Sequence, residues 1–341
     1  MLRKGLQSFL KYTLSLAIAA VLFWYLYKDQ DFNEMMARFR TANFNWIYLS
    51  IALAMFSHLL RAWRWNMLLE PLGYHLKTSR TFLAVMVGYL ANFVVPRMGE
   101  VSRCGILKKT DDVSVSRGFG SVVTERIFDM ICLLAIVAIT LAIEFRRLNE
   151  FFLNLFLDKA TGLEENFLTL IAIGITFLIG AIVIFFLLKR NQAFLRKNKY
   201  YNKLTAFLRQ LVEGITSVRK LRNPVLFVMV TLGIWICYFF MTYVVFFSMP
   251  ATSSLGFSAG LILLVLGGIG MATPVQGGIG AFHYLVSAGL LLYGVAEKDG
   301  IIFAFVLHTT NSIAIIVVGS ISLFISMIIP KRNSTQAYAN S

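Results

Sequence analysis

Long apolar segments alternate with short polar ones along almost the whole chain. A helix that crosses a bilayer needs about 20 largely apolar residues. Two further apolar stretches, 81–96 and 259–295, are interrupted by proline and glycine. The pattern predicts an all-α integral membrane protein with two broken segments and about six full spans, at 12–27, 44–60, 119–143, 167–188, 225–248 and 301–329.

The two broken segments are interrupted in the same way. ANFVVPRMGEVSR breaks at Pro96 and Gly99, and GMATPVQGGIGAF breaks at Pro274 and Gly277, 178 residues later, with Gly280 following. Irregular backbone persists at membrane depth only where protein or a water-filled cavity surrounds it. We therefore expect both breaks to line one central cavity, where the helix N-termini that follow them favour an anionic group.

The distribution of charge orients the loops. Cytoplasmic loops collect Lys and Arg, and residues 189–223 contain ten basic residues and one acidic residue. The same rule places both termini in the cytoplasm, and we expect the chain to lie in the cytoplasmic (inner) membrane. It assigns 1–11, 61–80, 189–223 and the tail to the inside, and 28–43, 144–165 and 297–300 to the outside.

A full crossing by 81–96 conflicts with this orientation, because the following basic segment 97–118 would lie outside. A re-entrant hairpin over 81–103 removes the conflict. Segment 259–295 then enters from the opposite face as a second hairpin. Its length also fits two short crossings, which would give eight spans if both broken segments cross, and charge alone leaves both arrangements open.

The order span, hairpin, span thus occurs twice with opposite orientation. A shift of 178 residues superposes the matching elements, which is typical of the inverted repeats of transporters. We predict a first repeat over 1–165, a second over 166–330 and a cytoplasmic tail over 331–341. The alternative is that Pro and Gly are simply frequent in membrane helices.

Composition narrows the functional classes. The chain is 58% hydrophobic and 14% charged, with a mean hydropathy of +0.72 and a net charge of +15. Because the basic residues gather in predicted cytoplasmic loops, we expect no nucleic-acid binding. The helical spacing of apolar residues within 189–223 predicts a basic amphipathic helix on the membrane surface. Phosphate-loop, dinucleotide and zinc motifs are absent, the three cysteines lie far apart, and we expect no cofactor.

Three charged residues lie inside a predicted span, in the stretch TERIFDM. Glu125, Arg126 and Asp129 are spaced so that they share one helix face. Charged groups within a bilayer are costly and normally face the protein interior, paired with one another. They form either a polar cluster beside the first hairpin or a structural ion pair near the interface.

Arginines near the first break are candidates for head-group binding. Arg97, Glu100 and Arg103 follow Pro96 directly, and a guanidinium binds phosphate through two parallel hydrogen bonds. Snorkelling to the interface is the alternative. Arg61 and Arg64, beside two tryptophans, are predicted to anchor the end of a span at the interface, with head-group contact as the second interpretation.

The second half offers neutral polar groups in place of charges. Near the second break these are Gln276 and His283, beside Gly277 and Gly278, which permit close backbone approach. His308 and Asn311 lie within the last span. Such groups mark interior faces of membrane helices, although a plain helix–helix hydrogen bond explains Asn311 equally well.

These motifs together resemble the lysylphosphatidylglycerol synthase transmembrane family, also called flippase-like. The resemblance rests on NFVVPRMGEVSR, SVVTERIFDM and PVQGGIGAFHYLV and covers roughly residues 10–330. It implies a membrane protein that moves a phospholipid or related amphiphile between leaflets. Well-known members carry a cytosolic aminoacylating domain. Only KRNSTQAYANS follows Pro330 here, so we do not carry that activity over.

Three functions follow from these observations. We expect a lipid transporter without catalytic residues, whose partners are membrane lipids with an anionic head group. The alternatives are an integral-membrane transferase that uses a lipid-phosphate donor, and a non-catalytic scaffold for lipid-modifying or glycan enzymes. The sequence leaves open a homodimer, the identity of the lipid and the energy source.

Overall fold

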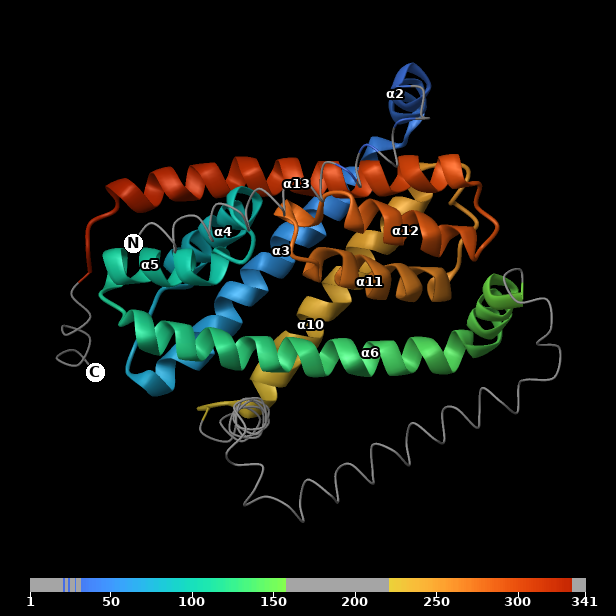
Figure 1. Cartoon of the computed structure of the whole chain (residues 1–341). Helices are drawn as coiled ribbons and strands as arrows, with labels where there is room; N and C mark the ends of the chain where they lie inside the picture. The colour runs from blue at the N-terminus through green and yellow to red at the C-terminus, as the bar shows by residue number, and fades with distance from the viewer. Residues whose placement is uncertain (1–20, 22–23, 25–27, 29–31, 158–220, 333–341) are drawn as a thin grey trace, which may run out of the picture. The chain divides into compact units, whose positions relative to one another are not determined.

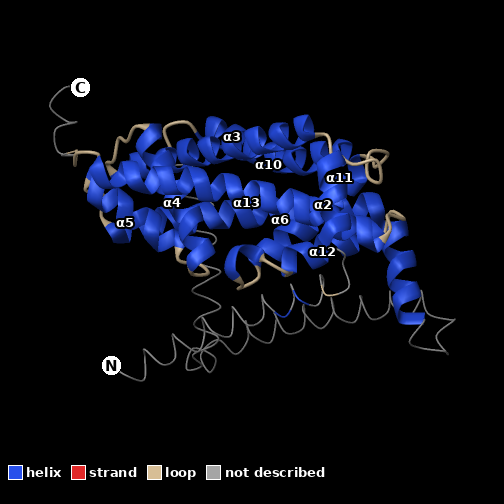
Figure 2. Ribbon diagram, turned by 90° about the horizontal axis from the view of Figure 1, so that it is seen from above, coloured by secondary structure: helices blue, strands red, loops and turns tan. Residues whose placement is uncertain are grey.

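The computed structural model describes residues 21, 24, 28, 32–157 and 221–332. All regular structure in these residues is helical (Figure 2), as predicted. The elements are α2 (Phe32–Thr41), α3 (Phe44–Leu69), η1 (Glu70–Leu72), α4 (Thr78–Val94), α5 (Gly99–Asp111), α6 (Val115–Leu157), α10 (Pro224–Tyr243), η3 (Val244–Ser248), α11 (Phe257–Ala272), η4 (Gln276–Gly278), α12 (Ala281–Leu291) and α13 (Glu297–Ile328).

Among the described residues, 4 stretches are long and apolar enough to cross a membrane. They match four of the predicted spans. The predicted spans 12–27 and 167–188 and the basic helix within 189–223 lie outside or almost outside the described residues. The candidate spans run over Phe44–Leu72, Val115–Phe145, Pro224–Ser248 and Glu297–Ile328.

The chain divides into two compact units. One unit contains Met1–Ile143 and Val218–Ser341, and the other contains Glu144–Ser217. The helix α6 passes from the first unit to the second at Glu144, whose φ of −103° and ψ of 16° interrupt the helical geometry. The described parts of both predicted repeats therefore lie almost wholly within the first unit.

Both broken segments fold as helical hairpins. The helices α4 and α5 have 17 and 13 residues, and α11 and α12 have 16 and 11 residues. At about 1.5 Å per residue, none of them reaches across a hydrocarbon core of about 30 Å. These lengths favour re-entrant hairpins over additional crossings. The inverted repeat stays a prediction.

The two hairpins pack along different stretches of α13 (Figure 1). Gly300, near the start of α13, lies against Ser287 of α12, and Gly319, further along, lies against Met86 and Leu90 of α4. Small residues at these positions allow close helix contact, as is common between membrane helices. The helix α13 therefore joins the α11–α12 hairpin to the α4–α5 hairpin.

The tips of the two hairpins touch. Gly277 of η4 has a φ of 57°, and a Cβ added to it would lie 2.5 Å from Cε1 of Phe93 at the end of α4. Both the backbone conformation and the contact therefore favour glycine at this position.

We expect Gly277→Ala to destabilise the protein more than Gly294→Ala. Gly294 also has a positive φ, 75°, but nothing lies within 4 Å of its added Cβ. Both substitutions impose left-handed strain of about 1–2 kcal/mol, and only Gly277→Ala also displaces Phe93, which costs about 1–3 kcal/mol more. Thermal unfolding in detergent measures the difference, and equal losses would contradict the contact between the tips.

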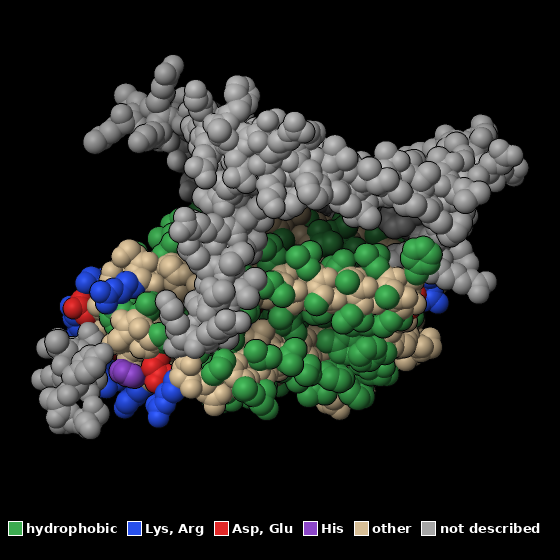
Figure 3. Space-filling model, turned by 90° about the horizontal axis from the view of Figure 1, so that it is seen from below, with side chains coloured by type: hydrophobic (Ala, Val, Ile, Leu, Met, Phe, Trp, Pro, Cys, Tyr) green, Lys and Arg blue, Asp and Glu red, His purple; other side chains and the backbone are tan. Residues whose placement is uncertain are grey.

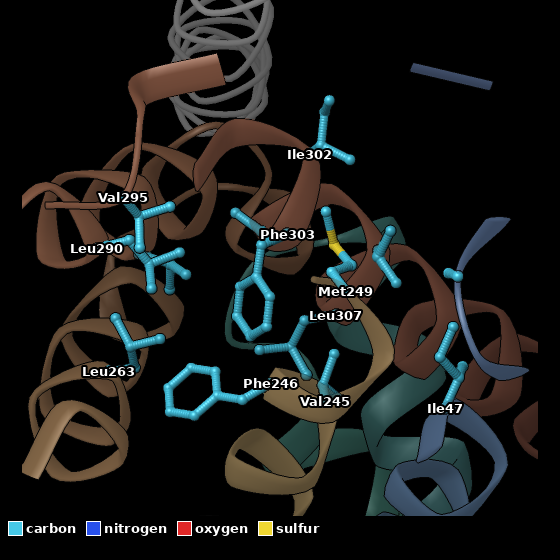
Figure 4. Packing of buried hydrophobic residues seen from close by; sticks show 14 of the residues in the cluster. Ile47, Val245, Phe246, Met249, Leu263, Leu290, Val295, Ile302, Phe303 and Leu307 are labelled. Atoms are coloured by element: carbon cyan, nitrogen blue, oxygen red, sulfur yellow. The ribbon is translucent and has the colours of Figure 1, made fainter. Parts of the chain in front are cut away.

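The largest apolar cluster joins α3, η3, α11, α12 and α13. Phe246 and Phe303 are fully buried in it, with ring centroids 5.4 Å apart. Figure 4 shows these rings among Val245, Leu263 and Leu307. On the outside, Figure 3 shows hydrophobic side chains over most of the visible described surface and charged side chains towards its ends. This distribution is expected of helices surrounded by lipid.

A polar contact ties the end of α13 to the α4–α5 hairpin. Arg80 donates to the carbonyl oxygens of Thr110 and Pro330, at 3.0 and 3.3 Å. The amide of Arg332 donates to the carbonyl of Thr110 at 2.8 Å. Hydrogen bonds from Lys108 and Lys331 lower the pKa of the exposed Asp112 carboxyl. This contact holds the start of the predicted cytoplasmic tail against α5.

Candidate functional site: a buried arginine–carboxylate network

Two carboxylates on α6 form the centre of the site. Glu125 is fully buried, and Asp129, one turn later, is 14% exposed. The candidate span on α6 runs over Val115–Phe145, and at about 1.5 Å per residue Glu125 lies about 15 Å from its start, about a third of the way along it. Charged groups at such a depth require partners inside the protein.

Glu125 binds three arginines from two other helices. Its Oε1 accepts a hydrogen bond of 2.6 Å from Nη2 of Arg61 and lies 3.4 Å from Nη2 of Arg64, both on α3. Its Oε2 accepts a hydrogen bond of 3.1 Å from Nη1 of Arg103 on α5. One buried carboxylate thus joins α3 and the first hairpin to α6.

Asp129 completes the pairing of the α3 arginines. Arg61 and Arg64 donate to its two oxygens at 2.7 and 2.6 Å. Arg61 also donates to the hydroxyl of Tyr238 at 2.8 Å, which adds α10 to the network. Fork-shaped guanidinium groups suit such multiple contacts with carboxylates.

The outer part of the network is more loosely paired. Nη2 of Arg126 lies 3.3 Å from Glu100 on α5, and its Nη1 lies 3.6 Å from Asp129. The side chain of Arg126 is 45% exposed. This ion pair therefore closes the space between α5 and α6 at the surface.

The network has an excess of positive charge. Within the described part of the chain, the arginines Arg61, Arg64, Arg103 and Arg126 face three carboxylates, those of Glu100, Glu125 and Asp129. Arg103 is 4% exposed, and among the described residues neither its Nε nor its Nη2 has a hydrogen-bond partner. These two N–H groups form one edge of the guanidinium, which is the edge that holds two oxygens of a phosphate or carboxylate. Such an unpartnered edge is suited to an anion.

Packing holds Arg103 in place. Its guanidinium carbon lies 4.5 Å from the ring centroid of Trp65, a favourable cation–π geometry. The indole Nε1 of Trp65 donates to Ser121 at 2.8 Å. The orientation of Arg103 is therefore set by α3 and α6 together.

The structure corrects the interpretation of Arg61 and Arg64. The sequence predicted interfacial anchors beyond a span that ends at residue 60, but α3 continues to Leu69. Both side chains turn inward, 4% and 0% exposed. The prediction was wrong because the partners of both arginines, Glu125 and Asp129, are far away in sequence and could not be inferred. Paired with these carboxylates, the guanidinium groups are stable inside the protein and do not have to reach the membrane interface.

Five of the other predicted site residues come together in this network. They are Glu100, Arg103, Glu125, Arg126 and Asp129. Arg97 lies outside the network, exposed at the turn after Pro96 with a φ of 64°. A role of Arg97 in binding stays a prediction.

The polar residues of the second half form a separate group. His308 lies 2.8 Å from the carbonyl oxygen of Gly277, and the amide of Gly280 donates to Nδ1 of His283 at 3.2 Å. The histidine rings are 4.7 Å apart. Gln276 and Gly278 lie in η4 itself. Asn311 donates to the carbonyl of Leu307 at 2.9 Å and approaches Ser50 at 3.4 Å.

Sequence reasoning missed Tyr238 and His58, and it placed Trp65 at the interface, whereas this side chain is fully buried. His58 packs against Tyr89 with ring centroids 4.4 Å apart and the rings tilted by 39°. Among the described residues, neither ring nitrogen of His58 has a hydrogen-bond partner. His58, Arg61 and Trp65 follow each other at helical spacing with no breaker before Pro71. This periodicity was the signal that α3 continues with a polar inner face. Nothing in the sequence marked Tyr238.

The fold and the site together define an all-α integral membrane protein with a charged network buried between its spans and a hairpin. The chain belongs to the family described as the lysylphosphatidylglycerol synthase TM region, which matches residues 12–319. The family that the motifs predicted is thereby confirmed.

Two curated relatives come from Methanocaldococcus jannaschii. The UPF0104 membrane protein MJ1078 is 23% identical over 239 residues, which are 70% of this chain and 94% of the relative. The UPF0104 membrane protein MJ1595 is 29% identical over 90 residues, 26% of this chain and 27% of the relative. No solved structure shows a significant match to the chain.

Proposed function

We propose that the protein transports a lipid with a phosphate-bearing head group between the leaflets of the cytoplasmic membrane, with both termini in the cytoplasm. The head group binds at the arginine–carboxylate network while the acyl chains stay in the bilayer. The observation that carries this proposal is the Nε–Nη2 edge of Arg103, which has no hydrogen-bond partner among the described residues. This edge is buried in a network whose described members are four arginines and three carboxylates.

The arrangement of the hairpins supports the same proposal. The α4–α5 hairpin supplies Arg103, and its tip contacts Gly277 of the other hairpin. Irregular backbone between two short helices lines cavities rather than lipid. A head group at Arg103 is thus positioned next to elements that end inside the membrane. Movement of the hairpins relative to α6 would open the Arg126–Glu100 pair and admit the head group.

Leaflet exchange in liposomes tests the proposal. Purified protein is reconstituted with fluorescent anionic, zwitterionic and uncharged lipids, and dithionite quenching reports exchange. We expect accelerated exchange of the phosphate-bearing lipids. An absence of acceleration for every lipid class overturns the proposal.

We expect Arg103→Gln to slow exchange at least tenfold, because a bidentate phosphate contact is a charge-assisted interaction of about 1.5–3 kcal/mol. Arg103→Lys keeps the charge but not the planar edge of the guanidinium. Its exchange rate should therefore lie between those of the wild type and Arg103→Gln. Arg117→Gln is the matched control, since Arg117 is an exposed arginine on the same helix, α6, as Glu125. Equal rates for Arg103→Gln and Arg117→Gln, in folded protein, would remove Arg103 from the site.

A further inference from the structure

A polar side chain is buried in the middle of a candidate membrane span. His58 lies midway along the span Phe44–Leu72 and is 6% exposed. Among the described residues, neither of its ring nitrogens has a hydrogen-bond partner. Two buried polar atoms without hydrogen bonds are costly at such a depth. Substrate sites of many transporters lie near the midplane of the bilayer, so His58 is placed where a polar group of a substrate would satisfy it.

Tyr89 of α4 connects this histidine to the arginine network. The rings of His58 and Tyr89 have centroids 4.4 Å apart, and the side chain of Tyr89 is partly buried. The preceding residue, Gly88, packs on Arg103, because a Cβ added to Gly88 would lie 3.3 Å from Cβ of Arg103. The Tyr89 hydroxyl both donates and accepts hydrogen bonds. It therefore adds a second polar group beside the proposed phosphate site.

The charge around His58 determines which ligand the pair accepts. Arg61 follows His58 by one helical turn and interacts with it electrostatically. Within the described residues, no acidic side chain bonds to the ring of His58. A positive charge on the buried ring would therefore be unfavourable beside this arginine. The neutral ring offers one N–H donor and one nitrogen acceptor.

We propose that His58 and Tyr89 form a second part of the head-group site, which binds a hydroxyl group of a polyol head group while Arg103 holds the phosphate. This inference rests on the proposed function, because it concerns the same lipid. A hydroxyl group both donates and accepts, so it pairs with either nitrogen of the neutral ring. An ammonium group only donates, and Arg61 repels it. A choline group has no N–H or O–H at all.

One head group is long enough to reach both parts of the site. Trp65 lies 4.5 Å from the guanidinium of Arg103 and follows His58 by two helical turns, on the same face of α3. Two turns extend about 10 Å along the helix. The bound phosphate and the side chains of Arg103 and His58 bridge part of this distance, and the polyol bridges the rest. The hydroxyl group then lies closer to the middle of the span than the phosphate.

Lipid binding in detergent tests this site without transport. Dioctanoyl phosphatidylglycerol and phosphatidylinositol carry hydroxyl groups on glycerol and on a cyclic polyol. Dioctanoyl phosphatidylethanol has the same phosphodiester charge and no hydroxyl group. Microscale thermophoresis gives the Kd of each lipid. We expect a hydroxyl-bearing lipid to bind about threefold to tenfold more tightly than phosphatidylethanol, the contribution of one net hydrogen bond, and the comparison of the two polyols shows which one fits.

Substitutions separate hydrogen bonding from packing. His58→Phe keeps an aromatic ring against Tyr89 but removes both ring nitrogens, and Tyr89→Phe removes only the hydroxyl. Both variants should lose the preference for the hydroxyl-bearing lipid and keep the affinity for phosphatidylethanol. His58→Gln restores one donor and one acceptor and should retain the preference, which a purely structural role of the ring does not predict. The matched control is His75→Phe, since His75 is 53% exposed in the loop before α4.

The outcomes distinguish this site from the proposed function. Equal affinity of the wild type for all three lipids, or a preference that persists in both His58→Phe and Tyr89→Phe, overturns the hydroxyl site. Lipid exchange in liposomes would then leave the proposed function standing without it. A preference that depends on His58, in a protein that exchanges no lipid, overturns the proposed function and leaves a site that binds lipid without moving it.

Discussion

Glu125→Gln is expected to lower the free energy of unfolding by about 3–5 kcal/mol, the usual cost of removing one partner from a buried ion pair. The loss arises because Arg103 and the two α3 arginines share this carboxylate, at 2.6 to 3.4 Å. Glutamine has nearly the same shape, so packing is retained and only the charge is removed. Chemical or thermal unfolding of the purified protein in detergent measures the change.

The matched control is Glu70→Gln. Glu70 lies 3.5 Å from Arg222, whose side chain is 86% exposed, and exposed pairs contribute about 0–1 kcal/mol. The double variant with Arg103→Gln should recover part of the loss, since it removes one of the unpaired charges. Similar losses for Glu125→Gln and Glu70→Gln would mean that the network is hydrated rather than buried.

Gly99→Ala is expected to disrupt the first hairpin. A Cβ on Gly99 would collide with the backbone oxygen of Gly88 and lie 2.7 Å from Nδ2 of Asn92. The amide of Gly99 also donates to Oδ1 of Asn92 at 2.7 Å, which fixes the start of α5. Because a backbone atom cannot move without separating α4 from α5, we expect a loss of at least about 3 kcal/mol, the upper end for overpacked sites.

Gly105→Ala separates this steric effect from the effect of adding a methyl group to α5. Gly105 is exposed on the same helix, and nothing lies within 4 Å of its added Cβ. Alanine there should stabilise the helix by up to about 1 kcal/mol. Opposite signs for the two variants in thermal unfolding are the expected result. A neutral Gly99→Ala would show that the hairpin helices do not meet through their backbones.

The positions of both breaks were predictable from local chemistry. Proline lacks an amide hydrogen and glycine permits a positive φ. Pro96 and Gly277 therefore interrupt the helices whatever the tertiary packing around them. The interior position of Glu125 and Asp129 was also predictable, because charged groups in hydrocarbon must turn towards protein. Their helical spacing placed both on one face before any partner was known.

The partners themselves were not predictable. Arg61 precedes Glu125 by 64 residues and Tyr238 follows Arg61 by 177, and no local pattern connects such distant positions. The same holds for Phe93 and Gly277, which meet only because α4 and α12 pack on the same helix.

The sequence by itself determined the class of protein, the four described spans and the two interruptions, since apolar length, proline and glycine act within a few residues. Only the tertiary structure decided that Arg61 and Arg64 face inward, that one edge of the Arg103 guanidinium has no partner among the described residues, and that two histidines contact the second turn. Pairing of buried charges depends on which helices become neighbours, and that choice is made by packing over the whole chain.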